Sequence, residues 1–183
     1  MKVSILFLLS ILAVSCSKPT ARRPINPKPS TTINGLVKEN KILNQIENKK
    51  IAYLIAKDST HQYYESHKGF WYTYVHQIKE NTVTPQKGDI VTFEYNIKNL
   101  KGTFIYTKEE LGVKTYSVDK EDFITALQSG IKLMKRGETI TFVVPSYNAF
   151  GISGDGDRIG INQSIISTVT LIDIKSIKKN ENN

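Results

Sequence analysis

Residues 88–97 of this 183-residue chain read GDIVTFEYNI and contain the clearest alternation of apolar and polar side chains in the sequence. Apolar side chains occupy every second position, namely Val91, Phe93, Tyr95 and Ile97. Because successive side chains of a β-strand point to opposite faces, this spacing predicts a strand with one buried face. The stretch therefore predicts a half-buried sheet in the middle of the chain.

Segments on both sides of this strand predict the rest of an α+β domain. Residues 70–75, 104–106, 140–144 and 165–174 are rich in aromatic and β-branched residues and predict further strands. The best helix candidate runs from Asp119, a possible N-cap, to Lys135, and its apolar stripe is Phe123, Ile124, Leu127, Ile131 and Met134. Strands around one short helix, without βαβ alternation, predict an antiparallel sheet.

A second helix is predicted upstream, over residues 38–60. Leu43, Ile46, Tyr53 and Leu54 recur at helical spacing from Lys38 to Lys57, which contains no proline or glycine. We expect the domain proper at residues 61–177 and a frayed tail at residues 178–183.

The first residues of the chain predict export and lipidation. An apolar run from Val3 to Val14 is too short to span a bilayer and fits a secretory signal over residues 1–15. It ends in LAVSC, which resembles the cleavage box of bacterial lipoproteins, and this resemblance implies acylation of Cys16, the only cysteine. Residues 16–37 contain four of the six prolines and predict an extended, solvated tether.

The net charge of +8 is confined to the segments that flank the predicted domain. Residues 16–50 carry eight basic and two acidic side chains, whereas residues 51–172 carry thirteen of each. The tether could attract anionic headgroups, or its charges could simply keep it soluble. Because the balanced middle offers no basic groove, nucleic acid is the least favoured partner.

The sequence contains no constellation typical of metal or nucleophilic catalysis. His61, His67 and His76 have no cysteine or paired carboxylates beside them, so we interpret them as surface residues. Residues 154–157, GDGD, lack the remaining ligands of a calcium loop and are interpreted as a turn. We therefore expect neither a metal nor a cofactor, and an enzyme built this way must act through shape and polarity.

The motif core, residues 88–174, resembles an FKBP-type peptidyl-prolyl isomerase domain. The resemblance is carried by GDIV at 88–91, by Tyr95 and Gly102, by the helix with Gly130, and by VPS at 144–146 and AFG at 149–151. It implies an FKBP-like twisted antiparallel sheet wrapped around one short helix, with an additional N-terminal helix here. Together with the lipoprotein box, the whole chain is similar to the gliding-motility-associated isomerase lipoproteins of Bacteroidetes.

The resemblance also implies site residues. As catalytic residues it gives Tyr95, Phe123, Ile124, whose N–H would anchor the substrate carbonyl, and Phe150. As substrate-binding residues it gives Ile105, Tyr106, Leu127, Ile159 and Ser167. Ile105 and Tyr106 occupy the place of the usual Phe–Asp pair, although a shift of one residue would bring in Phe104 instead. Leu127 and Ser167 replace larger rings, and Phe150 lacks the usual hydroxyl, so we expect a wider pocket with fewer hydrogen-bond donors.

Two functions follow from this resemblance. The first is a lipid-anchored prolyl isomerase that acts on proline-containing exported polypeptides. Its place would be the bacterial cell envelope, on the outer rather than the inner membrane, with the domain facing the periplasm. The alternative is a catalytically weak or inactive binding module of the gliding or secretion machinery. The replaced pocket residues motivate this second function.

Overall fold

The structure is a computed structural model that describes residues 29–80 and 82–177. The chain divides into two compact units, Met1–Lys38 and Glu39–Asn183, and the second contains the whole sheet. The predicted signal peptide, the lipidated Cys16, the first part of the tether and the tail from residue 178 lie outside the described residues.

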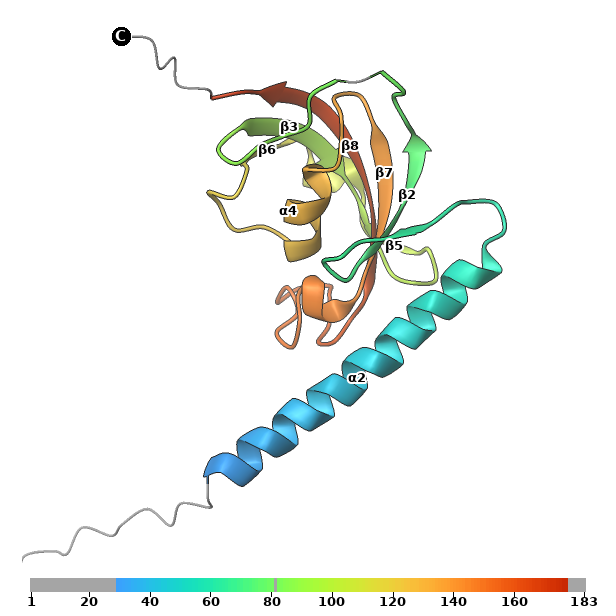
Figure 1. Ribbon diagram of the computed structural model, residues 1–183, viewed down its shortest axis with the longest axis vertical. Coiled ribbons are helices and arrows are strands. Elements are labelled where there is room, and N and C mark those ends of the chain that lie inside the picture. The colour runs from blue at the N-terminus through green and yellow to red at the C-terminus, as the bar shows by residue number, and fades with distance from the viewer. Residues whose placement is uncertain (1–28, 81, 178–183) are drawn as a thin grey trace, which may run out of the picture. The chain divides into compact units, whose positions relative to one another are not determined.

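One antiparallel sheet of eight strands dominates the described part of the second unit (Figure 1). Its strands are β1 (Tyr64–Glu65), β2 (Trp71–His76), β3 (Ile90–Tyr95), β4 (Ile97–Lys98), β5 (Phe104–Tyr106), β6 (Lys114–Ser117), β7 (Thr139–Val144) and β8 (Ile165–Lys175). The main strand order is β1-β2-β7-β8-β3-β6, and β4 pairs with both β5 and β8. The α+β class with an antiparallel sheet is confirmed.

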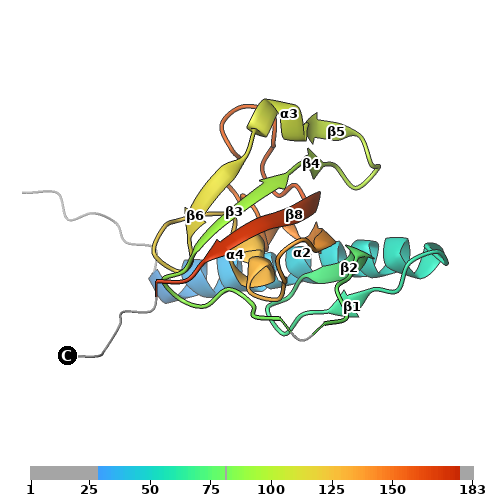
Figure 2. The ribbon, with the colours of Figure 1, turned by 90° about the horizontal axis from the view of Figure 1, so that it is seen from above.

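Strand β3 shows the alternation predicted from its sequence. Val91, Phe93 and Tyr95 are buried, whereas Thr92 and Glu94 are partly exposed. The strand lies between β6 and β8, and its buried side chains join those of β7 and β8 in a single apolar core. Figure 2 shows β4, β5 and the short helix α3 (Lys108–Leu111) together at one side of the sheet, away from β1 and β2.

Helix α4 (Thr125–Ile131) packs against the sheet and is shorter than the predicted helix from Asp119 to Lys135. Asp119 has a φ of 56° and does not cap the helix; its carboxylate accepts from Lys132 Nζ at 2.9 Å instead. Since a left-handed residue cannot belong to a right-handed helix, the segment before Ile124 forms turns.

The closest approach of α4 to β7 occurs at Gly130. A Cβ atom there would come within 2.4 Å of Cε1 of Phe142, which is shorter than any ordinary carbon contact. The glycine therefore allows the helix to lie directly on the sheet. This close packing also fixes the position of the residues at the start of α4 relative to the sheet.

Helix α2 (Pro29–Lys57) begins earlier than predicted, because proline is tolerated in the first turn of a helix. The predicted upstream helix is present, and Leu43, Ile46, Tyr53 and Leu54, whose spacing indicated it, are all exposed. The face turned to the body of the second unit is centred on Ile51, which is 0% exposed. None of the helices that the structure describes, α2 included, has the length and apolar character needed to cross a membrane.

Candidate active site

Four side chains form one side of the candidate site, which we call the helix wall. They come from β3, from the two residues that directly precede α4, and from α4 itself: Tyr95, Phe123, Ile124 and Leu127. The ring of Phe123 meets the ring of Tyr95 edge to face, with 5.5 Å between centroids. Phe93 and Tyr116 complete the aromatic group around Phe123 at 5.6 and 5.8 Å. Leu127 is fully buried beneath them, so the wall is a continuation of the apolar core.

Two polar groups of the helix wall are left available for a ligand. The N–H of Ile124, directly before α4, makes no hydrogen bond to any residue that the structure describes, whereas the neighbouring carbonyl of Phe123 accepts from Gln128 Nε2 at 2.9 Å. Such free N–H groups are normal at the start of a helix. The hydroxyl of Tyr95 likewise has no partner within the described ranges, and burial raises the pKa of Tyr95.

A second part of the candidate site, which we call the loop wall, is the loop of residues 145–164 with Phe150 and Ile159, both of which join the same apolar core. It starts with a 3-10 turn, η2 (Ser146–Asn148), and the turn is closed by the N–H of Gly151, which donates to the carbonyl of Ser146 at 2.8 Å. The N–H of Asn162 donates to the carbonyl of Gly151, which joins the two halves of the loop. Phe150 packs half-buried against the core, and Ile159 is buried within it.

Strand β5 contributes Ile105 and Tyr106, and both pack against the core. Phe104, the alternative register, is 53% exposed and lies under Lys98 Nζ outside that cluster. Ile105 and Tyr106 thus pack against the core, as the first of the two alternative registers requires, and Phe104 does not. Ser167 is also buried, but its hydroxyl donates to the carbonyl of Asn96 at 2.8 Å and so serves the fold between β8 and the β3–β4 junction.

An acidic group next to the site was missed from the sequence. The hydroxyl of Tyr106 donates to Asp155 at 2.6 Å and to Asp157 at 3.2 Å. The first of these bonds is the main reason that the pKa of Tyr106 rises to about 12. The same Asp155 accepts from the N–H of Ile159 at 2.8 Å, so the carboxylate joins β5 to the loop wall.

Burial opposes the ionisation of Asp155, but its hydrogen bonds from Tyr106 and from backbone N–H groups prevail and lower its pKa. This carboxylate comes from the GDGD turn at 154–157 and lies beside Tyr106, at the position where the family resemblance implies an aspartate on the strand. In the sequence, only the GDGD turn at 154–157 and a tyrosine on a predicted strand pointed to this contact.

The three histidines lie on the surface, and a cavity adjoins the side of the loop wall that faces α2. His61, His67 and His76 are exposed, as expected of surface residues. A cavity of about 580 Å³ lies outside the site, between residues 40–50 of α2, the turn at 99–101 and the outer side of the 146–164 loop. Its lining contains none of the residues predicted to be catalytic.

The antiparallel sheet and the short helix packed on it define an FKBP-like domain. The family model for FKBP-type peptidyl-prolyl cis-trans isomerases matches residues 81–172, and the chain belongs to this family. The resemblance inferred from the motifs is confirmed at this level.

Two curated relatives match over about half of the chain. The probable FKBP-type peptidyl-prolyl cis-trans isomerase FkpA of Neisseria meningitidis is 36% identical over 91 residues, which are 49% of this chain and 33% of the relative. The outer membrane protein MIP of Legionella longbeachae is 32% identical over 91 residues, 50% of this chain and 39% of the relative. The match thus spans well under half of these relatives' length.

Solved structures show the same fold at lower identity. The crystal structure of FkpA from Escherichia coli has a TM-score of 0.60 at 22% identity and covers 81% of this chain and 67% of that one. A peptidyl-prolyl cis-trans isomerase from Pseudomonas syringae has a TM-score of 0.58 at 18% identity, covering 74% and 96%. These two likenesses support the fold alone.

Proposed function

We propose that the protein is a peptidyl-prolyl cis-trans isomerase that assists the folding of exported envelope proteins. The observation that carries this proposal is the helix wall: an apolar, aromatic surface in which the N–H of Ile124 and the hydroxyl of Tyr95 have no partner among the described residues. Membership of the isomerase family supports the reaction class.

The reaction requires no charged catalytic group. Rotation about the X–Pro bond is slow because the amide is conjugated, with a barrier of ~18–20 kcal/mol. Conjugation makes the planar amide more polar than the twisted one, so water stabilises the planar form more strongly. A site that excludes water therefore lowers the cost of twisting. The rings of Phe123, Tyr95 and Phe150 supply such surroundings here.

The N–H of Ile124 acts on the substrate's carbonyl oxygen. A donor fixed in position can hold that carbonyl while the proline ring stays in the apolar site, so that the bond between them is twisted. The hydroxyl of Tyr95 offers a second donor beside it. With Phe150 in place of a tyrosine, the loop wall contributes shape but no hydroxyl.

A proline-peptide assay tests this proposal. The purified protein is expected to accelerate cis-to-trans conversion, and the double variant Phe123→Ala, Phe150→Ala is expected to lose the acceleration while remaining folded by circular dichroism. Phe104→Ala is the matched control, since it removes an exposed ring outside the site. An uncatalysed rate with micromolar wild-type protein would contradict the proposal.

We further propose that the protein is anchored in the envelope by acylation of Cys16 and faces the periplasm from the outer membrane. The lipoprotein-like box at 12–16 supports this, as does the similarity to the outer membrane protein MIP of Legionella longbeachae. Metabolic labelling with a fatty acid should mark the wild type and not Cys16→Ser. The similarity to Bacteroidetes lipoproteins suggests a link to gliding, which deletion of the gene should reveal as slower spreading.

A second candidate is a binding module that uses the same site without catalysis. The replacement of the family's strand aspartate by Tyr106, whose hydroxyl is occupied by Asp155, favours it. Complementation separates the two functions. If the folded Phe123→Ala, Phe150→Ala variant restores function in cells while lacking isomerase activity, the binding module is correct.

A further inference from the structure

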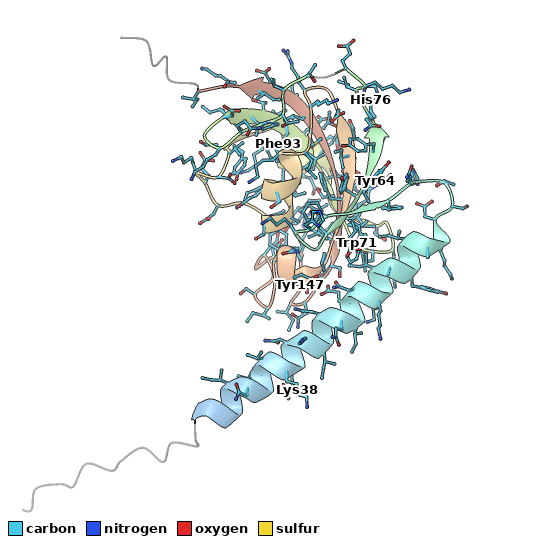
Figure 3. The ribbon with its side chains drawn as sticks, in the orientation of Figure 1. Lys38, Tyr64, Trp71, His76, Phe93 and Tyr147 are labelled. Atoms are coloured by element: carbon cyan, nitrogen blue, oxygen red, sulfur yellow. The ribbon has the colours of Figure 1, made fainter. Side chains whose placement is uncertain are left out.

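The part of α2 within the second unit docks on the body mainly through polar side chains. Glu47, Asn48 and Ile51 lie on one face of the helix, because residues three and four positions apart are neighbours. Ile51 is the only fully buried residue among them, whereas Asn48 accepts from the hydroxyl of Tyr147 at 3.0 Å. Figure 3 labels Tyr147 on the side of the body next to α2. Such an interface, with one fully buried apolar side chain, buries little apolar surface. Because hydrogen bonds are directional, it mainly fixes the position of the helix relative to the groups that it contacts.

Glu47 makes the most extensive of these contacts. Its Oε1 accepts from the N–H of Ser146 at 2.8 Å, and its Oε2 accepts from the Ser146 hydroxyl at 2.9 Å. The hydroxyl of Ser164 also donates to Oε1. Ser146 is 4% exposed and Ser164 is 8% exposed, so these donors are screened from water and depend on the carboxylate.

The two serines are the two stems of the loop wall. Ser146 opens the turn η2 directly after β7, and Ser164 directly precedes β8. Phe150 and Ile159 lie on the loop between them. The pairing of Val144 with Ile165 brings the two ends of the loop together. Beyond that last pair, one carboxylate, 99 residues before the first stem and 117 residues before the second, links Ser146 to Ser164 and anchors both to α2.

We propose that Glu47 is a positioning residue of the isomerase site, whose carboxylate holds both stems of the 145–164 loop so that Phe150 and Ile159 face the helix wall. This inference rests on the proposed function, since it assigns the loop wall to substrate binding. The proposal adds α2 to the elements that shape the site, although this helix precedes residues 81–172, which match the family.

The test compares three substitutions of Glu47. Glu47→Ala removes every contact, and kcat/KM is expected to fall between about 10- and 100-fold, the range for a misplaced binding group. The loss should appear in KM, because the loop wall contacts the substrate before and during rotation. Glu47→Gln keeps the length and can still join both serines, so it should restore most of the activity. Glu47→Asp, one methylene shorter, should lie between them.

Two control variants separate positioning from general stability. Ile51→Val loosens the same helix interface without touching the stems, and Glu39→Gln removes an exposed carboxylate of the same helix. Both should keep the wild-type KM. A merely structural role would reduce the folded fraction, and hence the apparent kcat, at an unchanged KM in Glu47→Ala and Ile51→Val alike.

Hydrogen exchange gives a readout that does not depend on activity. In Glu47→Ala, the amides of Ser146, Gly151 and Asn162 are expected to lose protection, whereas those of α4 keep it. Wild-type protein without isomerase activity would refute the proposed function, and hydrogen exchange together with binding of a proline peptide would then still decide the role of Glu47. Unchanged exchange and unchanged KM in Glu47→Ala would overturn the proposal.

Discussion

The two walls of the site are held in place by different forces. The helix wall belongs to the apolar core: Leu127 is fully buried, and Phe123 is surrounded by three aromatic rings. The loop wall also buries Ile159 in the core, but hydrogen bonds from outside the loop hold it as well, with Glu47 at its stems and Tyr106 near its tip. The proposed function requires both walls to enclose a proline.

This difference indicates how each wall can fail. Apolar packing resists changes of pH and is lost only when the core opens, so damage to the helix wall appears as global unfolding. Hydrogen bonds to partly exposed carboxylates are sensitive to protonation and to single polar substitutions. We therefore expect the loop wall to loosen locally while the rest of the domain stays folded.

The largest effect is expected from Leu127→Ala in the helix wall. Removing a fully buried leucine side chain should lower the free energy of unfolding by about 3 kcal/mol, within the usual range for such cavities. Chemical denaturation measures this loss. Leu133→Ala, at a partly exposed position two residues after α4, is the control and should cost far less. Similar losses for both variants would show that the helix wall is not part of the core.

Gly130→Ala is expected to have the next largest effect. Its Cβ would collide with the ring of Phe142, so α4 must shift from β7, at a cost of about 2 kcal/mol. The shift also moves Ile124, and the isomerase rate should fall with it. Gly35→Ala is the matched control in α2, because no atom lies within 4 Å of the added Cβ. Equal denaturation midpoints for the two variants would contradict the close approach.

Much of the helix wall could be predicted from the sequence, whereas the loop wall could not. The period of two in β3 and the spacing of Phe123, Ile124 and Leu127 are local patterns, and the core selects them directly. The anchors of the loop depend on contacts between Glu47 and residues about a hundred positions away. No local pattern in the sequence encodes such a pairing.

The docking of α2 depends on distant contacts in the same way. Its apolar Leu43 and Ile46 are exposed, whereas the partly buried, polar Glu47 and Asn48 hydrogen-bond to the body beside the buried Ile51. A helix that docks by polar contacts reverses the usual rule that its apolar side is inside. The length of α4 was also overestimated, because Asp119 adopts a positive φ that its sequence context did not reveal.

Acidification should weaken the loop wall at a higher pH than the helix wall. The folded pKa of Asp155 is lowered, so its contribution is fully present above the unfolded value near 4 and is lost as the pH falls through the folded pKa. Below about pH 4, the amide protection of Asp157 and Ile159 should therefore decrease before that of α4. In Asp155→Asn, this acid-dependent step should be absent. Simultaneous loss of protection in both walls would contradict their independence.

The smallest effect is expected from Tyr106→Phe, which removes only the hydroxyl bonded to Asp155 and Asp157. Global stability should change little, while proteolysis within residues 154–158 becomes faster. The raised pKa has an alkaline counterpart: the bond persists below the unfolded value near 10 and is lost as the pH approaches about 12. Burial raises the pKa of Tyr63 to about 12 as well, so a tyrosinate absorbance titration of Tyr106→Phe should lose only part of this late step. The control Tyr64→Phe should retain all of it.

Strand β2 shows that the cooperative folding unit extends beyond the residues that match the family. It lies before the residues that match the family, yet it pairs along β7 from Trp71 to His76, and the adjacent Phe70 is fully buried. The segment that matches the family is therefore shorter than the segment that must fold as one cooperative unit. A gene fusion that joined only the recognisable part to another protein would expose the edge of β7 and leave a template for aggregation.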